Sequence, residues 1–108
     1  MGHEKIARMK HRSGCSCASS VYAAFSDVNK NMGQPPVPRS EGGRCGAVLS
    51  AVKTLREMGI GKADEFEMEF TARMGSVMCR DLMRSGRSCN DCVGIAAAIA
   101  DALTGEMK

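Results

Sequence analysis

The sequence predicts an all-α fold, a compact bundle of four main helices with one short extra helical turn. Ala and Met are good helix formers and are plentiful, while β-branched runs are short. Apolar residues recur at helical spacing in four segments, and Gly or Pro separates these segments. The 108 residues fit one domain spanning 1–108. We expect residues 1–12 to form a loosely ordered N-terminal segment.

The first helix is expected over about 13–30. Cys17, Val21, Phe25 and Val28 fall at i, i+4, i+8 and i+11, which places them on one apolar face. Residues 34–38 read Gln-Pro-Pro-Val-Pro, which cannot continue a helix and favours an extended loop.

The second helix is expected to begin after Gly43 and to reach about residue 58. Val48, Val52 and Leu55 belong to its apolar stripe, and Gly59 is a stop signal.

The third helix is expected to begin at Asp64, a suitable N-cap. Phe66, Phe70 and Met74 lie four residues apart, and the pattern breaks at Gly75 before a short helical turn over 77–83. These residues predict one full helix followed by the extra turn.

The fourth helix is expected from Ser88 or Cys89 to Leu103. Ser88 and Asp91 form a start that is similar to a capping box. Because most of the connections between the helices are short, antiparallel packing is the natural arrangement.

Composition and charge argue against several classes of protein. The net charge is +3 but the basic residues are scattered, and one Tyr with three Phe leaves little for bases to stack on, so we expect no nucleic-acid partner. No signal-peptide core is visible, and no apolar run approaches the ~18 residues that span a bilayer, so we expect no membrane partner. The sequence therefore predicts a cytoplasmic protein.

Six cysteines are the main functional signal. Cys15 and Cys17, Cys45, Cys79, and Cys89 with Cys92 all lie at or near expected helix starts. A helix N-terminus offers free N–H groups and partial positive charge, which favour the thiolate that binds metals or attacks disulfides. In a reducing compartment, six cysteines favour metal binding or redox chemistry over structural disulfides.

Three alternatives stay open at this point. The cysteines are simply small core residues; or they bind zinc, for which Cys89 and Cys92 have C-x2-C spacing but no second such pair exists; or they form a redox dithiol, with Cys89–Cys92 or Cys17–Cys79 as the pairs to test. His3 and His11 are expected to be solvated surface residues, and no catalytic residue is assigned.

The chain resembles the four-cysteine redox-active protein family with the C-GCAxxG-C-C signature. Four elements occur in the right order: 14–18 (Gly-Cys-Ser-Cys-Ala), 42–50 (Gly-Gly-Arg-Cys-Gly-Ala-Val-Leu-Ser), 75–82 (Gly-Ser-Val-Met-Cys-Arg-Asp-Leu) and 89–97 (Cys-Asn-Asp-Cys-Val-Gly-Ile-Ala-Ala). Ser50 departs from the family, which usually has Gly there. Ser is the next-smallest choice for a close approach of two helices.

The resemblance implies redox activity, and the cysteine pattern is also similar to that of split-Soret cytochromes, which carry an iron–sulfur cluster beside their haems. A c-type haem site is absent here, so the resemblance implies a [2Fe–2S] or [4Fe–4S] cluster without haem, used in electron transfer with an unknown redox partner protein. A homodimer is also considered. The cluster-binding residues that we expect are Cys17, Cys45, Cys79 and Cys89 as ligands, Cys92 as an extra or substitute ligand, Gly42, Gly43 and Gly46 for close backbone approach, and Arg44 for charge.

Overall fold

The computed structural model describes residues 3–36 and 43–105. These residues form six α-helices: α1 (His3–Arg12), α2 (Cys17–Ala24), α4 (Gly46–Glu57), α5 (Ala63–Met74), α6 (Cys79–Arg84) and α7 (Cys89–Gly105). Extended pairing within the described residues is limited to one isolated antiparallel bridge between Arg44 and Met78. The predicted all-α fold class is therefore confirmed.

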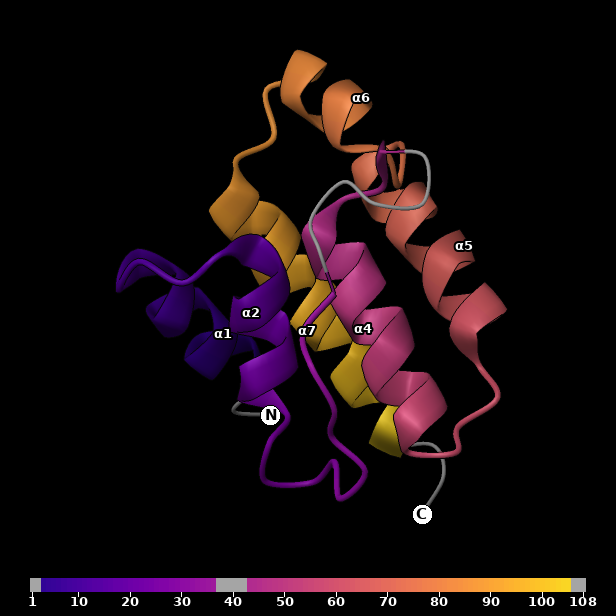
Figure 1. The fold of residues 1–108 in the computed structure, drawn as a ribbon. Helices are drawn as coiled ribbons and strands as arrows, with labels where there is room; N and C mark the ends of the chain where they lie inside the picture. The colour runs from indigo at the N-terminus through magenta and orange to yellow at the C-terminus, as the bar shows by residue number, and fades with distance from the viewer. Residues whose placement is uncertain (1–2, 37–42, 106–108) are drawn as a thin grey trace.

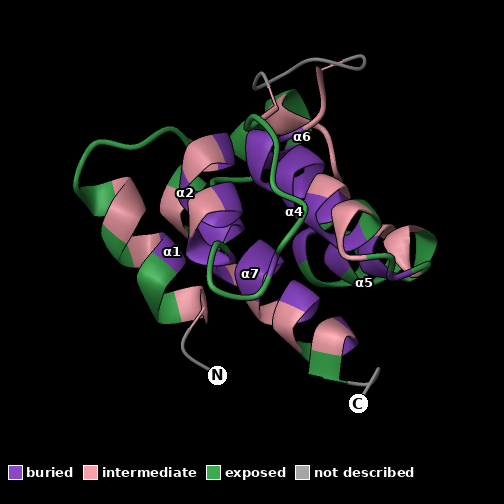
Figure 2. Ribbon diagram, turned by 60° about the horizontal axis from the view of Figure 1, so that its bottom comes forward, coloured by how far each residue is buried: buried purple, intermediate pink, exposed green. Residues whose placement is uncertain are grey.

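The long helix α7 lies at the centre of the bundle. It contacts α1, α2, α4 and α5, while α2 and α4 also pack against each other (Figure 1). The buried surfaces of α4 and α7 face inward, and exposed residues follow the loops and the outer faces (Figure 2). The largest buried side chains include Tyr22, Phe25, Leu55, Phe66, Phe70 and Val93.

The N-terminal segment differs from its expectation. Residues 3–12 form α1, an amphipathic helix that packs on α7 through the fully buried Ala7. Seven of its ten residues are charged or His, which is why the sequence pattern did not predict this helix. His3 is not a solvated surface residue: its ring stacks on Phe25 with centroids 4.3 Å apart, and its nitrogens bond to Asp27 and Asp101.

The helix expected over 13–30 is also shorter than predicted. It begins at Cys17, where the side chain of the N-cap Ser16 accepts a hydrogen bond from the N–H of Ser19, and it ends at Ala24. Val28 consequently leaves the apolar face and is 38% exposed.

The chain after α2 turns back against the end of α4. The carboxylate of Glu57 accepts hydrogen bonds from the hydroxyl of Tyr22 at 2.6 Å and the amide of Asn29 at 2.8 Å, and the Tyr22 oxygen in turn accepts the N–H of Gly33. These contacts fix the path of the loop across the lower half of α4.

The other helices follow the sequence pattern more closely. Phe66, Phe70 and Met74 are buried on α5 as predicted, but the N-cap is Lys62 rather than Asp64. The hydroxyl of Ser88 accepts the N–H of Asp91, which confirms the predicted cap of α7. None of the helices within 3–36 and 43–105 is long and apolar enough to span a bilayer.

Candidate thiol site

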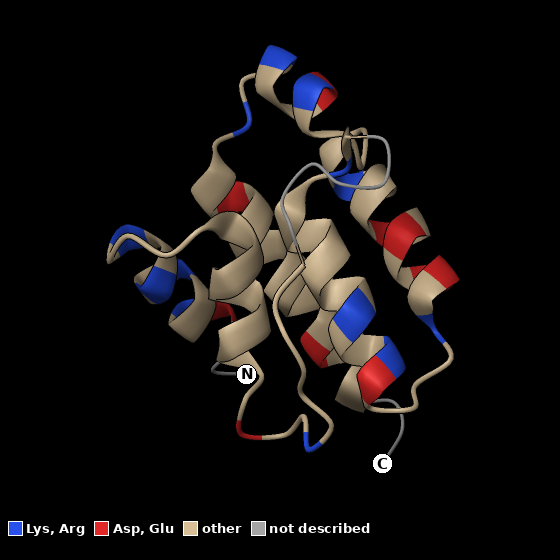
Figure 3. Cartoon of the chain, viewed as in Figure 1, with Lys and Arg blue, Asp and Glu red and all other residues tan. Residues whose placement is uncertain are grey.

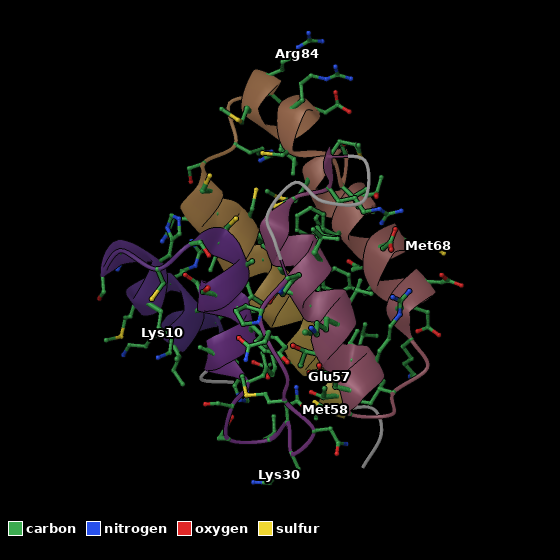
Figure 4. All side chains as sticks on the ribbon, viewed as in Figure 1. Lys10, Lys30, Glu57, Met58, Met68 and Arg84 are labelled. Atoms are coloured by element: carbon green, nitrogen blue, oxygen red, sulfur yellow. The ribbon has the colours of Figure 1, made fainter. Side chains whose placement is uncertain are left out.

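Three helices start at the same end of the bundle. The first residues of α2, α4 and α7 lie close together beneath the short helix α6 (Figure 1). Cys17 is the first residue of α2, Cys45 is the N-cap of α4, and Cys89 and Cys92 lie in the first turn of α7. Sulfur atoms gather at this end of the molecule (Figure 4).

These four thiols influence one another electrostatically. We call them the thiol site: Cys17, Cys45, Cys89 and Cys92. Cys45 and Cys89 both act on the pKa of Cys17, and all three act on the pKa of Cys92. Cys45 and Cys92 are buried, Cys17 is half-buried and Cys89 is exposed. The site is therefore open to the surface on the Cys89 side.

Cys45 and Cys92 share a hydrogen bond. The Cys92 thiol donates to the Cys45 sulfur, and this bond lowers the pKa of Cys45 to about 6 although burial opposes the change. The backbone N–H groups of Ala47 and Val48 also favour the Cys45 thiolate. The same bond raises the pKa of Cys92, and burial and the neighbouring thiolates add to that rise.

Cys17 behaves differently from a simple helix-start cysteine. Burial raises its pKa, the neighbouring Cys45 and Cys89 raise it further, and the N–H groups of Ala18 and Gly46 only partly compensate. The expectation that a helix start lowers the cysteine pKa therefore holds for Cys45 but not for Cys17, because burial, and after it the neighbouring thiols, disfavour a negative charge on Cys17.

Gly46 brings α2 and α4 together at the site. A Cβ on residue 46 would lie 2.6 Å from the sulfur of Cys17 and 3.2 Å from the backbone nitrogen of Ala18. One turn further along, the buried hydroxyl of Ser50 donates to the carbonyl oxygen of Ala18 at 2.6 Å. The small residue at position 50 thus lies at a close contact between helices, and its hydroxyl is hydrogen-bonded.

The loop before α6 is fastened to the start of α4. The N–H of Cys45 donates to the carbonyl of Val77 at 2.8 Å, next to the bridge between Arg44 and Met78. The guanidinium of Arg44 forms an ion pair with Glu67 on α5. Arg44 therefore takes part in holding this loop and α5 near the site. Gly43 has a φ of +92°, and Gly42 lies outside the described residues.

Cys79 and Cys15 are not part of the thiol site. Cys79 begins α6, two residues after Val77, but its thiol contacts the sulfur of Met83 at 3.9 Å. It is not among the main contributors to the pKa shifts of the other cysteines. Cys15 is exposed in a shallow groove beside Ile6 and Met9. The structure thus groups Cys92 with the predicted ligands and leaves Cys79 at the rim.

A single metal ion and an iron–sulfur cluster require different spacings of the donor sulfurs. A tetrahedral zinc ion needs sulfurs about 3.8 Å apart around one point, given Zn–S bonds of about 2.3 Å. Among residues 3–36 and 43–105, no three Cys, His, Asp or Glu side chains lie in an arrangement that could hold one metal ion. In a cluster, cysteines on different irons lie farther apart than zinc ligands, because irons and sulfides separate them, whereas two cysteines on one iron lie about as close as in a zinc site. Four thiols at three helix N-termini supply the type and number of donors that an iron–sulfur cluster requires.

Compared with models of known protein families, with curated protein sequences and with solved structures, the chain matches none of them. The likeness to the C-GCAxxG-C-C family stays a prediction from the four sequence elements.

Proposed function

We propose that this protein is a cytoplasmic redox protein that binds an iron–sulfur cluster at the thiol site. The observation that carries the proposal is the meeting of Cys17, Cys45, Cys89 and Cys92 at the N-termini of three helices. When bound, the cluster would supply one-electron transfer. The residues that would hold it are these four cysteines, with Cys79 at the rim.

The backbone supports an anionic group at this place. The N–H groups of Ala47 and Val48 point to the Cys45 sulfur, and those of Ala18 and Gly46 point to Cys17. Hydrogen bonds of this kind favour thiolates and would favour a negatively charged cluster in the same way. The free N–H groups of helix starts can therefore act as the counter-charge.

The exposed side of the site suggests where a redox partner would dock. Cys89 is exposed, and Arg80, Arg84 and Arg87 are exposed on or after the neighbouring α6 (Figure 3). An acidic surface on the partner protein would complement these arginines and bring its own redox group close to the site.

Metal analysis of protein purified without oxygen tests this proposal. We expect iron and acid-labile sulfide at two or four per chain, with a brown colour that dithionite bleaches. Cys45→Ser should lose both iron and colour, while Cys15→Ser, a change at the exposed cysteine outside the site, should keep them. Full iron in Cys45→Ser, or a colourless wild-type protein even after anaerobic reconstitution, would contradict the proposal. Stoichiometric zinc without colour would instead favour a zinc-stabilised interaction module.

A second candidate is a metal-free thiol–disulfide oxidoreductase, favoured by the hydrogen bond between Cys92 and Cys45. In this reaction the Cys45 thiolate attacks a substrate disulfide and releases one substrate thiol. The Cys92 sulfur then attacks the mixed disulfide, which releases the second thiol and leaves a Cys45–Cys92 disulfide. Metal-free protein that loses two mass units with oxidised dithiothreitol, in a Cys45–Cys92 bridge, would support this candidate.

A further inference from the structure

Arg8 of α1 lies flat against the beginning of α7, at a glycine. A Cβ on residue 94 would lie about 2.1 Å from the guanidinium carbon of Arg8, so this contact exists only because residue 94 has no side chain. The Arg8 guanidinium is also held by Glu4, one turn earlier on α1, at 3.1 Å. Its position over α7 is thus fixed from both helices.

The contacts of Arg8 fall on the two residues between Cys89 and Cys92. One guanidinium nitrogen donates to the side-chain oxygen of Asn90 at 3.1 Å and to its backbone carbonyl at 3.3 Å. The same nitrogen lies 3.5 Å from the carboxylate of Asp91. In return, the side-chain amide of Asn90 donates to the backbone carbonyl of Arg8 at 3.3 Å.

Helical geometry gives these contacts their significance. Positions 89 and 92 are three residues apart and share one face of the first turn, whereas 90 and 91 face away from it. Arg8 therefore contacts the first turn of α7 on the side opposite the thiols. The first turn of a helix has few hydrogen bonds of its own and frays readily. Contacts from a neighbouring helix therefore decide how well this turn is ordered.

We propose that Arg8 is a positioning residue for the thiol site, which holds the turn that carries Cys89 and Cys92 in place. This inference deepens the proposed function. It rests on that function only for the statement that the thiol site binds a cluster. The planar guanidinium meets two oxygens of Asn90 and lies flat on Gly94, which a lysine ammonium cannot reproduce.

The test is the alkylation rate of each cysteine in the metal-free protein, measured with iodoacetamide and peptide mass mapping. In Arg8→Met we expect the buried Cys92 to react about tenfold faster, the factor that follows from losing one hydrogen bond to a charged group. Arg8→Lys should react like Arg8→Met. Asn90→Ala keeps Arg8 but removes its side-chain acceptor, together with the bond from the Asn90 amide to the Arg8 carbonyl, and should also release Cys92. The matched control is Arg73→Met, which removes an arginine with the same i,i+4 carboxylate pairing on α5.

The outcomes separate positioning from general folding. Faster reaction confined to Cys92 and its neighbour Cys89 supports the proposal. Equal acceleration at Cys17 and Cys45, or wild-type rates in Arg8→Met or Arg8→Lys, overturns it. Because the measurement needs no metal, a protein that never binds iron would defeat the proposed cluster and leave this result intact. Where iron does bind, Arg8→Met should also change the visible and electron paramagnetic resonance spectra of the loaded protein.

Discussion

The sulfur of Cys17 lies directly against the α-carbon of Gly46, where α2 meets α4. The contact joins two of the helix starts that form the thiol site. It depends on the missing side chain of Gly46, because interiors are too closely packed to admit an extra methyl group at such a distance.

Gly46→Ala should push α2 and α4 apart. Relief requires the backbone of Ala18 to move as well as the cysteine side chain, so we expect the free energy of unfolding to fall by about 1–3 kcal/mol. Urea denaturation of the metal-free protein measures this. Gly61→Ala is the control, since a Cβ there meets nothing within 4 Å. It should change stability by no more than about 0.5 kcal/mol. Equal stability of the two variants would show that the contact of Gly46 with Cys17 and Ala18 leaves room for a methyl group.

Cys92 and Cys79 should differ as cluster ligands. Cys92 is buried within the thiol site, whereas the Cys79 thiol contacts Met83 on its own short helix. We therefore expect Cys92→Ser to lose most of the iron and the visible absorbance, and Cys79→Ser to keep both after anaerobic reconstitution. If Cys79→Ser lost the iron and Cys92→Ser kept it, α6 would have to rotate on cluster binding. The ligand set would then be the one expected from the sequence motif, which includes Cys79.

The reactivity of Cys45 in metal-free protein should report its hydrogen bond with Cys92. A pKa of about 6 makes Cys45 a thiolate at neutral pH, so its labelling rate should be half-maximal near pH 6. Cys92→Ala removes the bond, and the midpoint should move to higher pH. Labelling with iodoacetamide at a series of pH values, followed by peptide mass mapping, gives both curves. A midpoint for Cys45 that is the same in both proteins would contradict the shared hydrogen bond.

His3 should make stability depend on pH. Burial acts to lower its pKa, but hydrogen bonds to Asp27 and Asp101 outweigh burial and raise the pKa above 6.5. Because the folded state holds the proton more tightly than the unfolded state, the stabilisation is fully present below pH 6.5 and is lost as the pH rises through the folded pKa.

His3→Gln should remove this dependence and cost about 1–3 kcal/mol at pH 6, where the charged hydrogen bonds are complete. Urea midpoints between pH 6 and pH 9 measure the effect. The pH range stays above that in which Asp27, whose own pKa is lowered by His3, becomes protonated. A variant that keeps the same pH profile as the wild type would show that His3 does not carry the effect. Asp101→Asn tests the carboxylate partner of His3 with little change in shape, and it should reduce the dependence of stability on pH.

Most of the helices could be predicted because their signals are local. The spacing of Phe66, Phe70 and Met74 and the capping by Ser88 depend on residues within one or two turns. The cysteines were expected at helix starts for the same reason, and those of the thiol site lie there.

Features that depend on contacts between distant segments could not be predicted. α1 has only three apolar residues among its ten and is attached by His3 and Arg8 to residues far away in the sequence. The shortening of α2 depends in part on contacts of the following loop with Glu57.

The sequence by itself determined that the protein is helical and that cysteines begin its helices, because helix propensity, capping and periodicity act between near neighbours. Only the tertiary structure decided which cysteines meet. Cys92 joins Cys45 through the packing of α4 on α7, whereas the thiol of Cys79 contacts Met83 on its own short helix. Which thiols share a site is set by how whole helices pack, and spacing along the chain does not encode that.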